Sequence, residues 1–275
     1  MFSSLNTAVS ALQQFQDDIS LIGNNMANVN TTGFKDGIMN FADTLNQVIG
    51  LGGTTTEQIG SGVTTDSITS NFTQGTISQT GINSDLAVSG SGFFVVKDPS
   101  SGAEYVTRAG DFQVDANGYL VTANGMRVQG YSDSGLTTLG DIQINATGAP
   151  ATAAPGATVQ SYTIGQNGDL TLTLSDGTTF VRGQVLLQNF QAPNALQNQG
   201  NNLYSMTTAA GGLAQPVAAG TNGLGTIDSG ALEGSNVDLT TEMTNLIAAE
   251  RAFESNAKVI TTSDEVLQDL VNLKR

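Results

Sequence analysis

Residues 5–29 read LNTAVSALQQFQDDISLIGNNMANV and contain an unbroken apolar seam. Its members are spaced alternately by three and four residues: Leu5, Ala8, Leu12, Phe15, Ile19, Ile22, Met26 and Val29. That spacing places side chains on one face of an α-helix and is typical of a coiled-coil stripe. The sequence therefore predicts one helix from Ser3 to about Asn28 that needs a partner for its apolar face.

A second apolar row lies in the C-terminal part of the chain. Its members repeat every seven residues: Leu239, Leu246, Phe253, Ile260 and Leu267. Met243, Ala257 and Val271 are expected on the same face, with Asp238 or Ser235 as the helix cap. A long amphipathic helix commonly packs on its own domain, so pairing within the chain and pairing between copies are both open. We favour an assembly interface built from the two rows.

Between the two rows the pattern is that of β-structure. Four Asn-Gly or Asp-Gly pairs, at 117–118, 124–125, 167–168 and 176–177, separate short apolar runs. Such pairs favour type I′ hairpin turns because both central positions need positive φ. We expect strands near 86–96, 104–107, 111–114, 119–122, 126–131, 141–145, 159–164, 169–174, 179–182 and 184–190.

These patterns predict a mostly β fold with paired N- and C-terminal helices, in which short antiparallel strands form an outer domain. The expected divisions are a helical core domain at 1–33 and 234–275, a linker or loop region at 34–70, and a β-rich outer domain at 71–233. Residues 34–50 fit a short amphipathic helix or an extended arm, and the Gly- and Thr-rich residues 50–62 fit a mobile or partner-ordered loop.

Composition excludes several classes of function. The chain has 275 residues, 24 acidic and 9 basic side chains, and a net charge of −15, which opposes binding to nucleic acid or anionic membranes. With no Cys and no His, it has no Ser-His-Asp triad, Cys-His pair or His-containing zinc site. We therefore expect no enzyme activity, no cofactor and no metal. No apolar run is long enough to span a membrane, and no cleavable secretory signal is predicted.

Two motifs resemble ligand-binding loops without their context. Gly90-Ser91-Gly92 precedes an apolar strand pattern, whereas a dinucleotide-binding loop precedes a helix. Asp115-Ala116-Asn117-Gly118 lacks the distant bidentate Glu of a calcium loop. A tight turn or bulge and a hairpin turn are the respective interpretations.

Residues 24–35, NNMANVNTTGFK, closely resemble the N-terminal signature NNxANxxTxGFK of the axial proteins of the bacterial flagellum, the rod and hook family. The matching signature residues are Asn24, Asn25, Asn28, Gly33, Phe34 and Lys35. Further similar strings follow in the same order: QIGSGV at 58–63, residues 72–96, residues 105–131, and the C-terminal stretch that begins GALEGSNVDL. The resemblance therefore covers nearly the whole chain.

The resemblance implies a structural subunit that polymerises into a tube. In that family the terminal helices of many copies form an inner core around an export channel, and the β-domain packs outside. It also implies export by the flagellar type III apparatus to an extracytoplasmic position in the hook-basal body. The implied neighbours are identical subunits together with rod, hook-cap and hook–filament junction proteins.

Within the family, the strings ALEGSNVDL, NAKVI, DEVLQ and NLKR look more like the hook protein, the flexible joint that transmits motor torque to the filament. The length is closer to that of rod proteins. We favour a short hook protein, with the distal rod or drive-shaft protein as the second choice. A β-rich binding module that does not polymerise is the alternative from another class.

Overall fold

The computed structural model describes residues 2–44, 47–52, 55–213 and 215–273, which form two compact units. The helix unit comprises Met1–Val29, Asp36–Asn71 and Val237–Arg275, as far as these are described, and the β-unit comprises Asn30–Lys35 and Phe72–Asn236. The mostly β fold with two terminal helices is as predicted. The unit boundaries differ from the expected ones, because residues 36–71 group with the helices and residues 30–35 with the β-unit.

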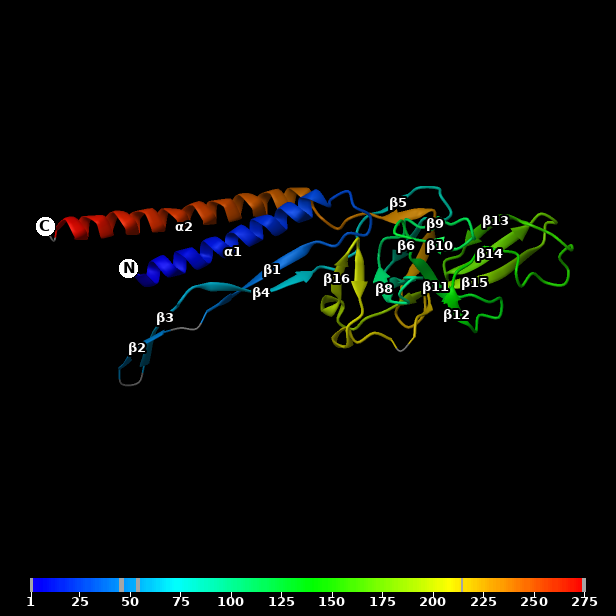
Figure 1. The fold of residues 1–275 in the computed structure, drawn as a ribbon, viewed down its shortest axis with the longest axis horizontal. Coiled ribbons are helices and arrows are strands. Elements are labelled where there is room, and N and C mark those ends of the chain that lie inside the picture. The colour runs from blue at the N-terminus through cyan, green and yellow to red at the C-terminus, as the bar shows by residue number, and fades with distance from the viewer. Residues whose placement is uncertain (1, 45–46, 53–54, 214, 274–275) are drawn as a thin grey trace. The chain divides into compact units, whose positions relative to one another are not determined.

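Two long helices form the helix unit, α1 (Phe2–Ala27) and α2 (Leu239–Leu273). They pack against each other and run in opposite directions (Figure 1). Asp238 is the cap of α2, as predicted, because its Oδ1 accepts the N–H of Thr240 at 2.8 Å and that of Thr241 at 3.4 Å. In the described part of the chain, neither helix is apolar over a stretch long enough to cross a bilayer.

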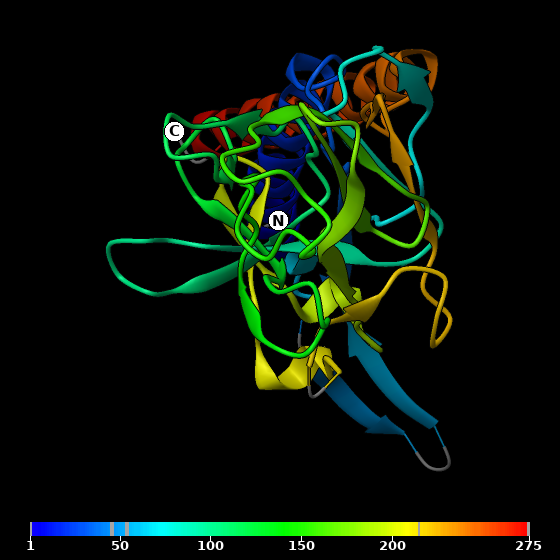
Figure 2. The same ribbon diagram turned by 90° about the vertical axis from the view of Figure 1, so that its right-hand side faces the viewer.

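Strands complete the helix unit. β1 (Gly37–Asp43) pairs antiparallel with β4 (Val63–Ser70), and β2 (Gln47–Gly52) pairs with β3 (Thr55–Ile59). The β2–β3 hairpin projects away from the helices in both ribbon views (Figures 1 and 2). Of the two options for residues 34–50, the extended one is therefore confirmed for the described residues.

The expectation of a loop at 50–62 is wrong for residues 50–52 and 55–59, which lie in β2 and β3, whereas residues 60–62 lie outside the strands. Composition gave the wrong expectation here. A stretch with few apolar side chains can still satisfy its backbone N–H and C=O groups by pairing with another strand. Thr is also a β-branched residue that favours strands. Polar groups of α1 contact the start of β4, which follows this stretch: Ser10 Oγ accepts the N–H of Val63 at 3.4 Å, and Gln14 contacts Thr65 through their side chains.

The β-unit consists of short strands and two 3-10 turns, η1 (Pro193–Ala195) and η2 (Thr208–Ala210). Its largest sheet has the order β13-β14-β15-β11-β7-β8-β17-β16, and β9, β10, β12 and β18 pair at its sides. Two further ladders join β6 to β19 and β5 to β20. The strands are β5 (Ile77–Gln79), β6 (Leu86–Ser89), β7 (Phe93–Lys97), β8 (Glu104–Thr107), β9 (Gln113–Val114), β10 (Leu120–Val121), β11 (Arg127–Tyr131), β12 (Leu139–Asp141), β13 (Val159–Ile164), β14 (Asp169–Leu174), β15 (Thr179–Gln188), β16 (Gln197–Gly200), β17 (Leu203–Ser205), β18 (Val217–Ala218), β19 (Thr226–Ser229) and β20 (Ala231–Glu233).

All four predicted hairpin turns are present, but they are not of the predicted type I′, because the φ of Asn117, Asn124, Asn167 and Asp176 is not positive. They connect β9 to β10, β10 to β11, β13 to β14, and β14 to β15, which pair in that order. The glycine of each turn has positive φ, for example +88° at Gly168. A Cβ at Gly168 would lie 2.2 Å from the carbonyl oxygen of Val185, so this turn needs glycine for space as well as for conformation.

Strand β7 lies at the centre of the β-unit and is buried on both faces. Phe94 packs in the main apolar cluster and meets Phe112 edge to face at 5.1 Å, whereas Phe93 and Val95 pack in a second cluster with Tyr204. Burial on both faces explains why this strand reads as the continuous run FFVV instead of alternating.

Several strand boundaries differ from the expected ones. The stretch 86–96 is divided into β6 and β7 at Gly90 and Gly92, which have φ of +109° and +130°. A turn there, followed by a strand, is the interpretation that the sequence favoured. The runs at 179–182 and 184–190 form the single strand β15.

Candidate functional site

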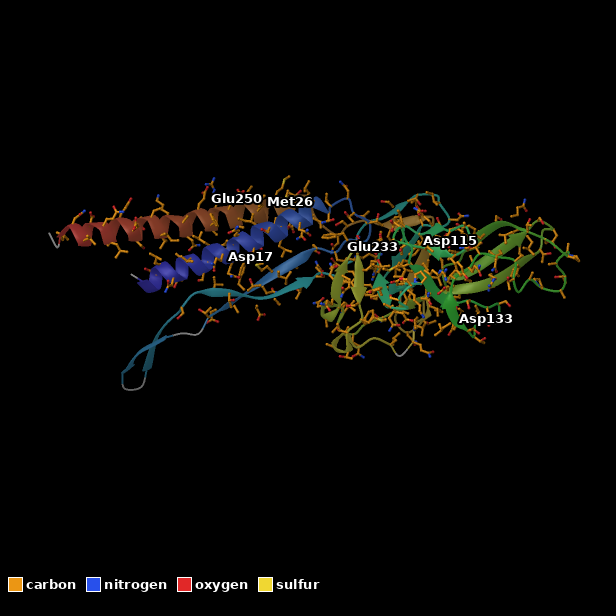
Figure 3. The ribbon with its side chains drawn as sticks, viewed as in Figure 1. Asp17, Met26, Asp115, Asp133, Glu233 and Glu250 are labelled. Carbon is orange, nitrogen blue, oxygen red and sulfur yellow. The ribbon has the colours of Figure 1, made fainter. Side chains whose placement is uncertain are left out.

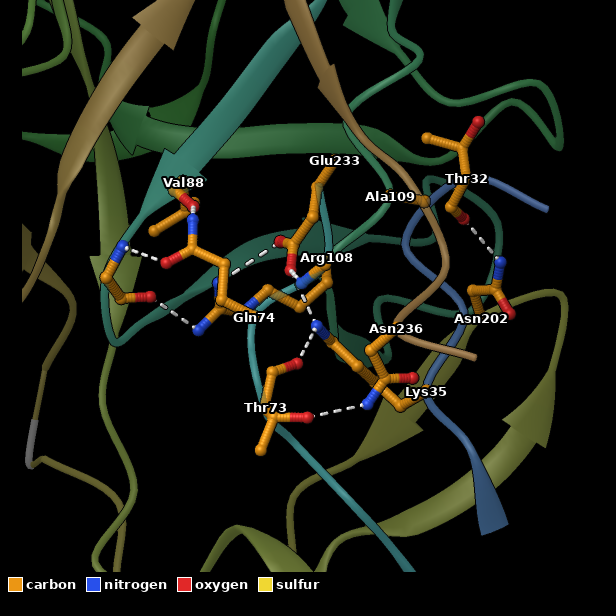
Figure 4. A network of polar contacts seen from close by, with 12 residues as sticks. Thr32, Lys35, Thr73, Gln74, Val88, Arg108, Ala109, Asn202, Glu233 and Asn236 are labelled. Atoms are coloured by element: carbon orange, nitrogen blue, oxygen red, sulfur yellow. Dashed lines mark hydrogen bonds and ion pairs between the residues drawn. The ribbon is translucent and has the colours of Figure 1, made fainter. Parts of the chain in front are cut away.

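The most buried polar group in the β-unit is an ion cluster of Lys35, Arg108 and Glu233. Lys35 Nζ lies 2.6 Å from Glu233 Oε1, and Arg108 Nη1 lies 3.2 Å from Glu233 Oε2 (Figure 4). The side chains of Lys35 and Glu233 have no exposed surface, and that of Arg108 is 4 % exposed. One carboxylate thus serves two cations, which is stabilising only if every remaining polar group is well placed.

Arg108 makes its other contacts to the glycine turn before β7. Its Nη2 donates to the carbonyl oxygen of Gly90 at 2.8 Å, and its guanidinium lies over the ring of Phe93 at 5.1 Å from the ring centre. Burial lowers the pKa of Arg108, and the charge of Glu233 opposes this shift. The glycine turn is therefore part of a structural ion network.

The ion cluster joins three segments that are far apart in the sequence. Lys35 Nζ donates to the carbonyl oxygen of Thr73 at 2.7 Å, and the N–H of Gly75 donates to Glu233 Oε1 at 2.9 Å. Asn236 Nδ2 donates to Thr73 Oγ1 at 2.9 Å (Figure 4). Each of these segments adjoins a position where the chain passes from one unit to the other, so the cluster fixes the β-unit ends of the connections.

Gly33 and Lys35 of the family signature contribute to this site. Gly33 has φ +67°, and its N–H donates to the carbonyl oxygen of Glu233 at 2.8 Å. A Cβ at Gly33 would lie 2.5 Å from the backbone nitrogen of Ala109, so no larger residue fits without a shift of the backbone. Phe34 lies between these two residues and accepts the N–H of Asn236 through its carbonyl oxygen at 3.4 Å.

The signature asparagines lie in the helix unit. Asn25 is buried, and its side chain pairs with the backbone of Gly37: Nδ2 donates to the carbonyl oxygen at 2.9 Å, and Oδ1 accepts the N–H at 3.0 Å. Asn28 Nδ2 donates to the carbonyl oxygen of Asn24 at 2.9 Å near the end of α1, while the side chain of Asn24 is exposed. Asn25 therefore attaches β1 to α1.

The predicted seam of α1 lies on covered parts of the helix. Ala8 and Ile22 are buried, and Leu5, Leu12, Phe15, Ile19 and Met26 are half-buried. Val29, the last predicted member, is half-buried but lies after the end of α1. The cover comes from α2, β1 and β4 of the same chain. Phe15 also packs on Phe41 of β1, with 5.9 Å between ring centres.

The predicted row of α2 is only partly covered. Leu246, Phe253, Ile260 and Leu267 are half-buried, but Leu239 is exposed. Of the residues expected on the same face, Met243 and Val271 are also exposed, whereas Ala257 is half-buried. The residues that complete the covered face at spacings of three and four are Glu242, Ala249, Asn256 and Ser263. Because these are polar or small, no apolar periodicity marks them.

Glu242 is a buried acid between the helices. It is 8 % exposed, and its Oε2 has no hydrogen-bond partner. Burial raises the pKa of Glu242, a hydrogen bond with the Asn25 side chain lowers it, and the charges of Asp36 and Asp18 raise it. Burial also raises the pKa of Asp18. Among the described residues of the helix unit, no cation compensates this acidic interior position.

Sequence reasoning missed Arg108, Glu233 and Glu242 as site residues. In a chain with only 9 basic residues, Arg108 is a cation within the string TRAG, next to small residues. Glu233 is likewise an isolated charge within ALEGS. A charged residue inside an otherwise small and apolar string is a signal of a buried ion pair.

Other carboxylates belong to turns. Asp115 Oδ1 accepts the N–H of Asn117 at 2.8 Å and that of Tyr119 at 2.7 Å, so the predicted hairpin turn is confirmed there. Asp133 accepts the N–H groups of Thr137 and Thr138, which with the Thr137 hydroxyl hold the pKa of Asp133 at about 2. Figure 3 shows Asp115 and Asp133 in the β-unit, and Asp17 and Glu250 on α1 and α2. Within the described ranges, no three acidic side chains gather as metal ligands.

Family models match three parts of the chain. Residues 5–35 match the flagella basal body rod protein model, residues 87–172 the flagellar hook protein FlgE/F/G D1 domain, and residues 228–273 the flagellar basal body rod FlgEFG protein C-terminal model. The flagellar basal-body rod protein FlgG of Bacillus subtilis (strain 168) is 39% identical over 283 positions that cover 100% of both chains. The chain belongs to the flagellar basal-body rod and hook family.

Other members of this family are also similar to this chain over nearly its whole length. The rod protein FlgG of Caulobacter vibrioides is 36% identical and covers 98% of this chain and 99% of its own. The hook protein FlgE of Escherichia coli (strain K12) is 27% identical over 412 positions, covering 98% of this chain and 100% of its own. The predicted family is thereby confirmed, and this protein is a structural component of the flagellum.

The ion cluster predicts that replacing Glu by Gln lowers the free energy of unfolding much more at position 233 than at position 104. Glu233→Gln leaves Lys35 and Arg108 buried without a counter-charge, and we expect it to lower the free energy of unfolding by about 3–5 kcal/mol. The matched control is Glu104→Gln, which breaks the Lys97 pair at 3.8 Å, where both side chains are about 40 % exposed or more. This control should cost less than about 1 kcal/mol. Denaturant titration of the soluble subunit measures both, and equal losses would contradict the assignment.

Glu242 predicts a pH dependence of the helix unit. Because its pKa is raised in the folded state, its carboxylate destabilises the fold as pH rises above the unfolded value of 4.5. We expect Glu242→Gln to raise the melting temperature of the monomer by a few degrees at pH 7 and to have little effect at pH 4. The control is Glu250→Gln, at an exposed position of α2. Thermal melts followed at the helical ellipticity band test this, and a lower melting temperature at pH 7 would contradict it.

Proposed function

We propose that this protein is a rod subunit of the flagellar basal body that self-assembles into a tubular helical polymer around an export channel. In this account the helix units of many copies form the inner wall, and the β-units lie outside. The predicted assembly residues of α1 and α2 are part of that inner wall. The subunit transmits torque mechanically and catalyses no reaction.

Uncovered apolar residues of α2 carry the proposal of a polymer. In its first part Leu239, Met243 and Ile247 follow one another at intervals of four, and the Ile247 side chain is 58 % exposed. In its second part Val259, Val266 and Leu273 follow at intervals of seven, all of them exposed. A helix in water buries such residues or pairs them with a partner. Two uncovered stretches on one helix fit contacts with more than one neighbouring copy.

The choice of rod over hook rests on length. The Bacillus subtilis rod protein aligns with the entire chain with few gaps, whereas the Escherichia coli hook protein needs 412 positions for the 275 residues of this chain. The hook relative therefore has long insertions that this protein lacks. The hook remains the second candidate function, because the C-terminal strings that favoured it and the match over 98% of the chain also fit a hook subunit.

The partner proteins of the subunit and its export route follow from the same proposal. A rod subunit contacts identical copies and other axial proteins, and as a hook subunit it would contact the hook-cap and hook–filament junction proteins instead. Export through the flagellar type III apparatus would place it outside the cytoplasm without a cleaved signal. The net charge of −15 suits neither nucleic acid nor anionic lipid as a partner.

Electron microscopy of the purified protein at high concentration tests the proposed function. A straight tube with a central channel is expected for a rod subunit. A curved or supercoiled tube would favour the hook, and a protein that stays monomeric under all assembly conditions would contradict both.

Ile247 provides a substitution that separates assembly from folding. Ile247→Asp places a charge at a position that the subunit's own chain leaves exposed, so the monomer should keep its melting temperature within about 1–2 °C. In the polymer the same charge would be buried without a partner, and we expect no sedimenting polymer at wild-type concentrations. Ile247→Leu is the matched control and should polymerise. Normal polymerisation of Ile247→Asp would show that this face of α2 is not an interface.

A further inference from the structure

The helix unit contains a groove lined by α1, β1 and the first part of α2. It has a volume of about 440 Å³. Its walls are mainly apolar, with Phe15, Leu21 and Ile22 from α1, and Ala248 and Ala252 from α2. The charged residues among its lining are both acidic, Asp18 and Glu242. A ligand that fits this groove combines an apolar surface with a positive charge.

Glu242 shows that the groove is incomplete in the single subunit. The side chain is more than nine-tenths buried, and Oε2 has less than 1 Å² of exposed surface and no hydrogen-bond donor among the residues that the structure describes. A buried carboxylate oxygen without a donor is costly, and natural proteins normally supply a hydrogen bond or a cation there. The basic partner of Glu242 is therefore expected from outside the subunit.

A segment with the matching chemistry lies at the other end of α2. Figure 1 shows α2 continuing beyond the first residues of α1. We call the last described residues of α2, 268–273, the α2 overhang. Val271 is 67 % exposed and Leu273 is 83 % exposed. In the sequence, the basic residues Lys274 and Arg275 follow directly. The overhang thus joins uncovered apolar side chains to two positive charges.

The overhang cannot fill the groove of its own subunit. Ala248 and Val271 are 23 residues apart on one continuous helix, and at 1.5 Å per residue their separation along the axis is about 35 Å. Of the other cations on α2, Arg251 pairs with Glu254 at 2.8 Å, and Lys258 is 16 residues after Glu242 on the same helix, about 24 Å away along its axis. Lys35 and Arg108 are buried in the β-unit. A second copy of the chain can provide the overhang.

We propose that, in the polymer proposed above, the α2 overhang of one subunit docks in the groove of the next subunit together with the following Lys274 and Arg275. One of these two basic side chains then donates a hydrogen bond to Glu242. The donor segment and the acceptor groove lie on different parts of the surface, so each copy both gives and receives the contact. Such a heterologous contact does not close on itself and produces an open string of subunits. It also supplies the charge and the apolar cover that each partner lacks.

Disulfide cross-linking tests the contact, since the chain has no Cys. Asn245 lines the groove and Asn272 is an exposed residue of the overhang. The double variant Asn245→Cys with Asn272→Cys is assembled in reducing buffer, checked for polymer by electron microscopy and then oxidised. A ladder of covalent dimers, trimers and longer oligomers is expected on a denaturing gel. The matched control, Asn245→Cys with Thr261→Cys, keeps the groove cysteine and moves the other to an exposed position about three turns before Asn272.

The outcomes separate this inference from the proposed function. A polymer that yields no ladder, or the same ladder from the control pair, would overturn the docking contact and leave the rod function intact. A wild-type chain that forms no polymer at all would overturn the proposed function, and the docking contact with it.

A charge experiment provides a second test that needs no cysteine. Glu242→Gln and the double change Lys274→Gln with Arg275→Gln should each raise the critical concentration for assembly about tenfold, the effect of losing one charge-assisted hydrogen bond. If the groups interact, combining all three changes should cost no more than either set alone. Fully additive losses, or no loss from the Lys274 and Arg275 changes, would contradict the contact.

Discussion

Glu233 holds the β-unit together at the points where the chain enters and leaves it. Its carboxylate pairs with Lys35 and Arg108, and it also accepts the N–H of Gly75, while its own backbone oxygen accepts the N–H of Gly33. Residues from both chain segments of the β-unit therefore meet at one side chain. Because all three charges are buried, each of them depends on the other two. This dependence gives a physical reason for the family signature: Gly33 permits the close backbone approach, and Lys35 supplies the charge.

The helix unit follows a different rule, because it is stabilised by contacts that the single chain only partly provides. α1 is covered by α2 and by the β1–β4 pair, and its polar side chains form hydrogen bonds with these strands. α2 has 35 residues, packs on α1 and leaves many of its large apolar residues exposed. In the proposed polymer these residues obtain their cover from neighbouring copies, so that assembly and the packing of α2 are one process.

How much the sequence could predict depended on whether the signal was local. The terminal helices, the cap at Asp238 and the four hairpin turns follow from spacing or from one turn residue, and all are present. The β2–β3 pairing was missed because residues rich in Gly and Thr have little apolar periodicity. Arg108 and Glu233 are 125 residues apart, and no local pattern connects them. The covered face of α2 was only half predicted, since Glu242, Asn256 and Ser263 interrupt its apolar pattern.

The central claim, that the uncovered surface of α2 is an assembly surface, is tested most directly by hydrogen exchange on the verified monomer and on the polymer. The account predicts slow exchange for β7 and β11 in both states, because β7 is buried and β11 pairs with neighbouring strands on both sides. It predicts that residues 259–273 of α2 exchange quickly in the monomer and slowly in the polymer. Equal exchange of residues 259–273 in the two states would show that α2 gains no cover on assembly, and would contradict the account.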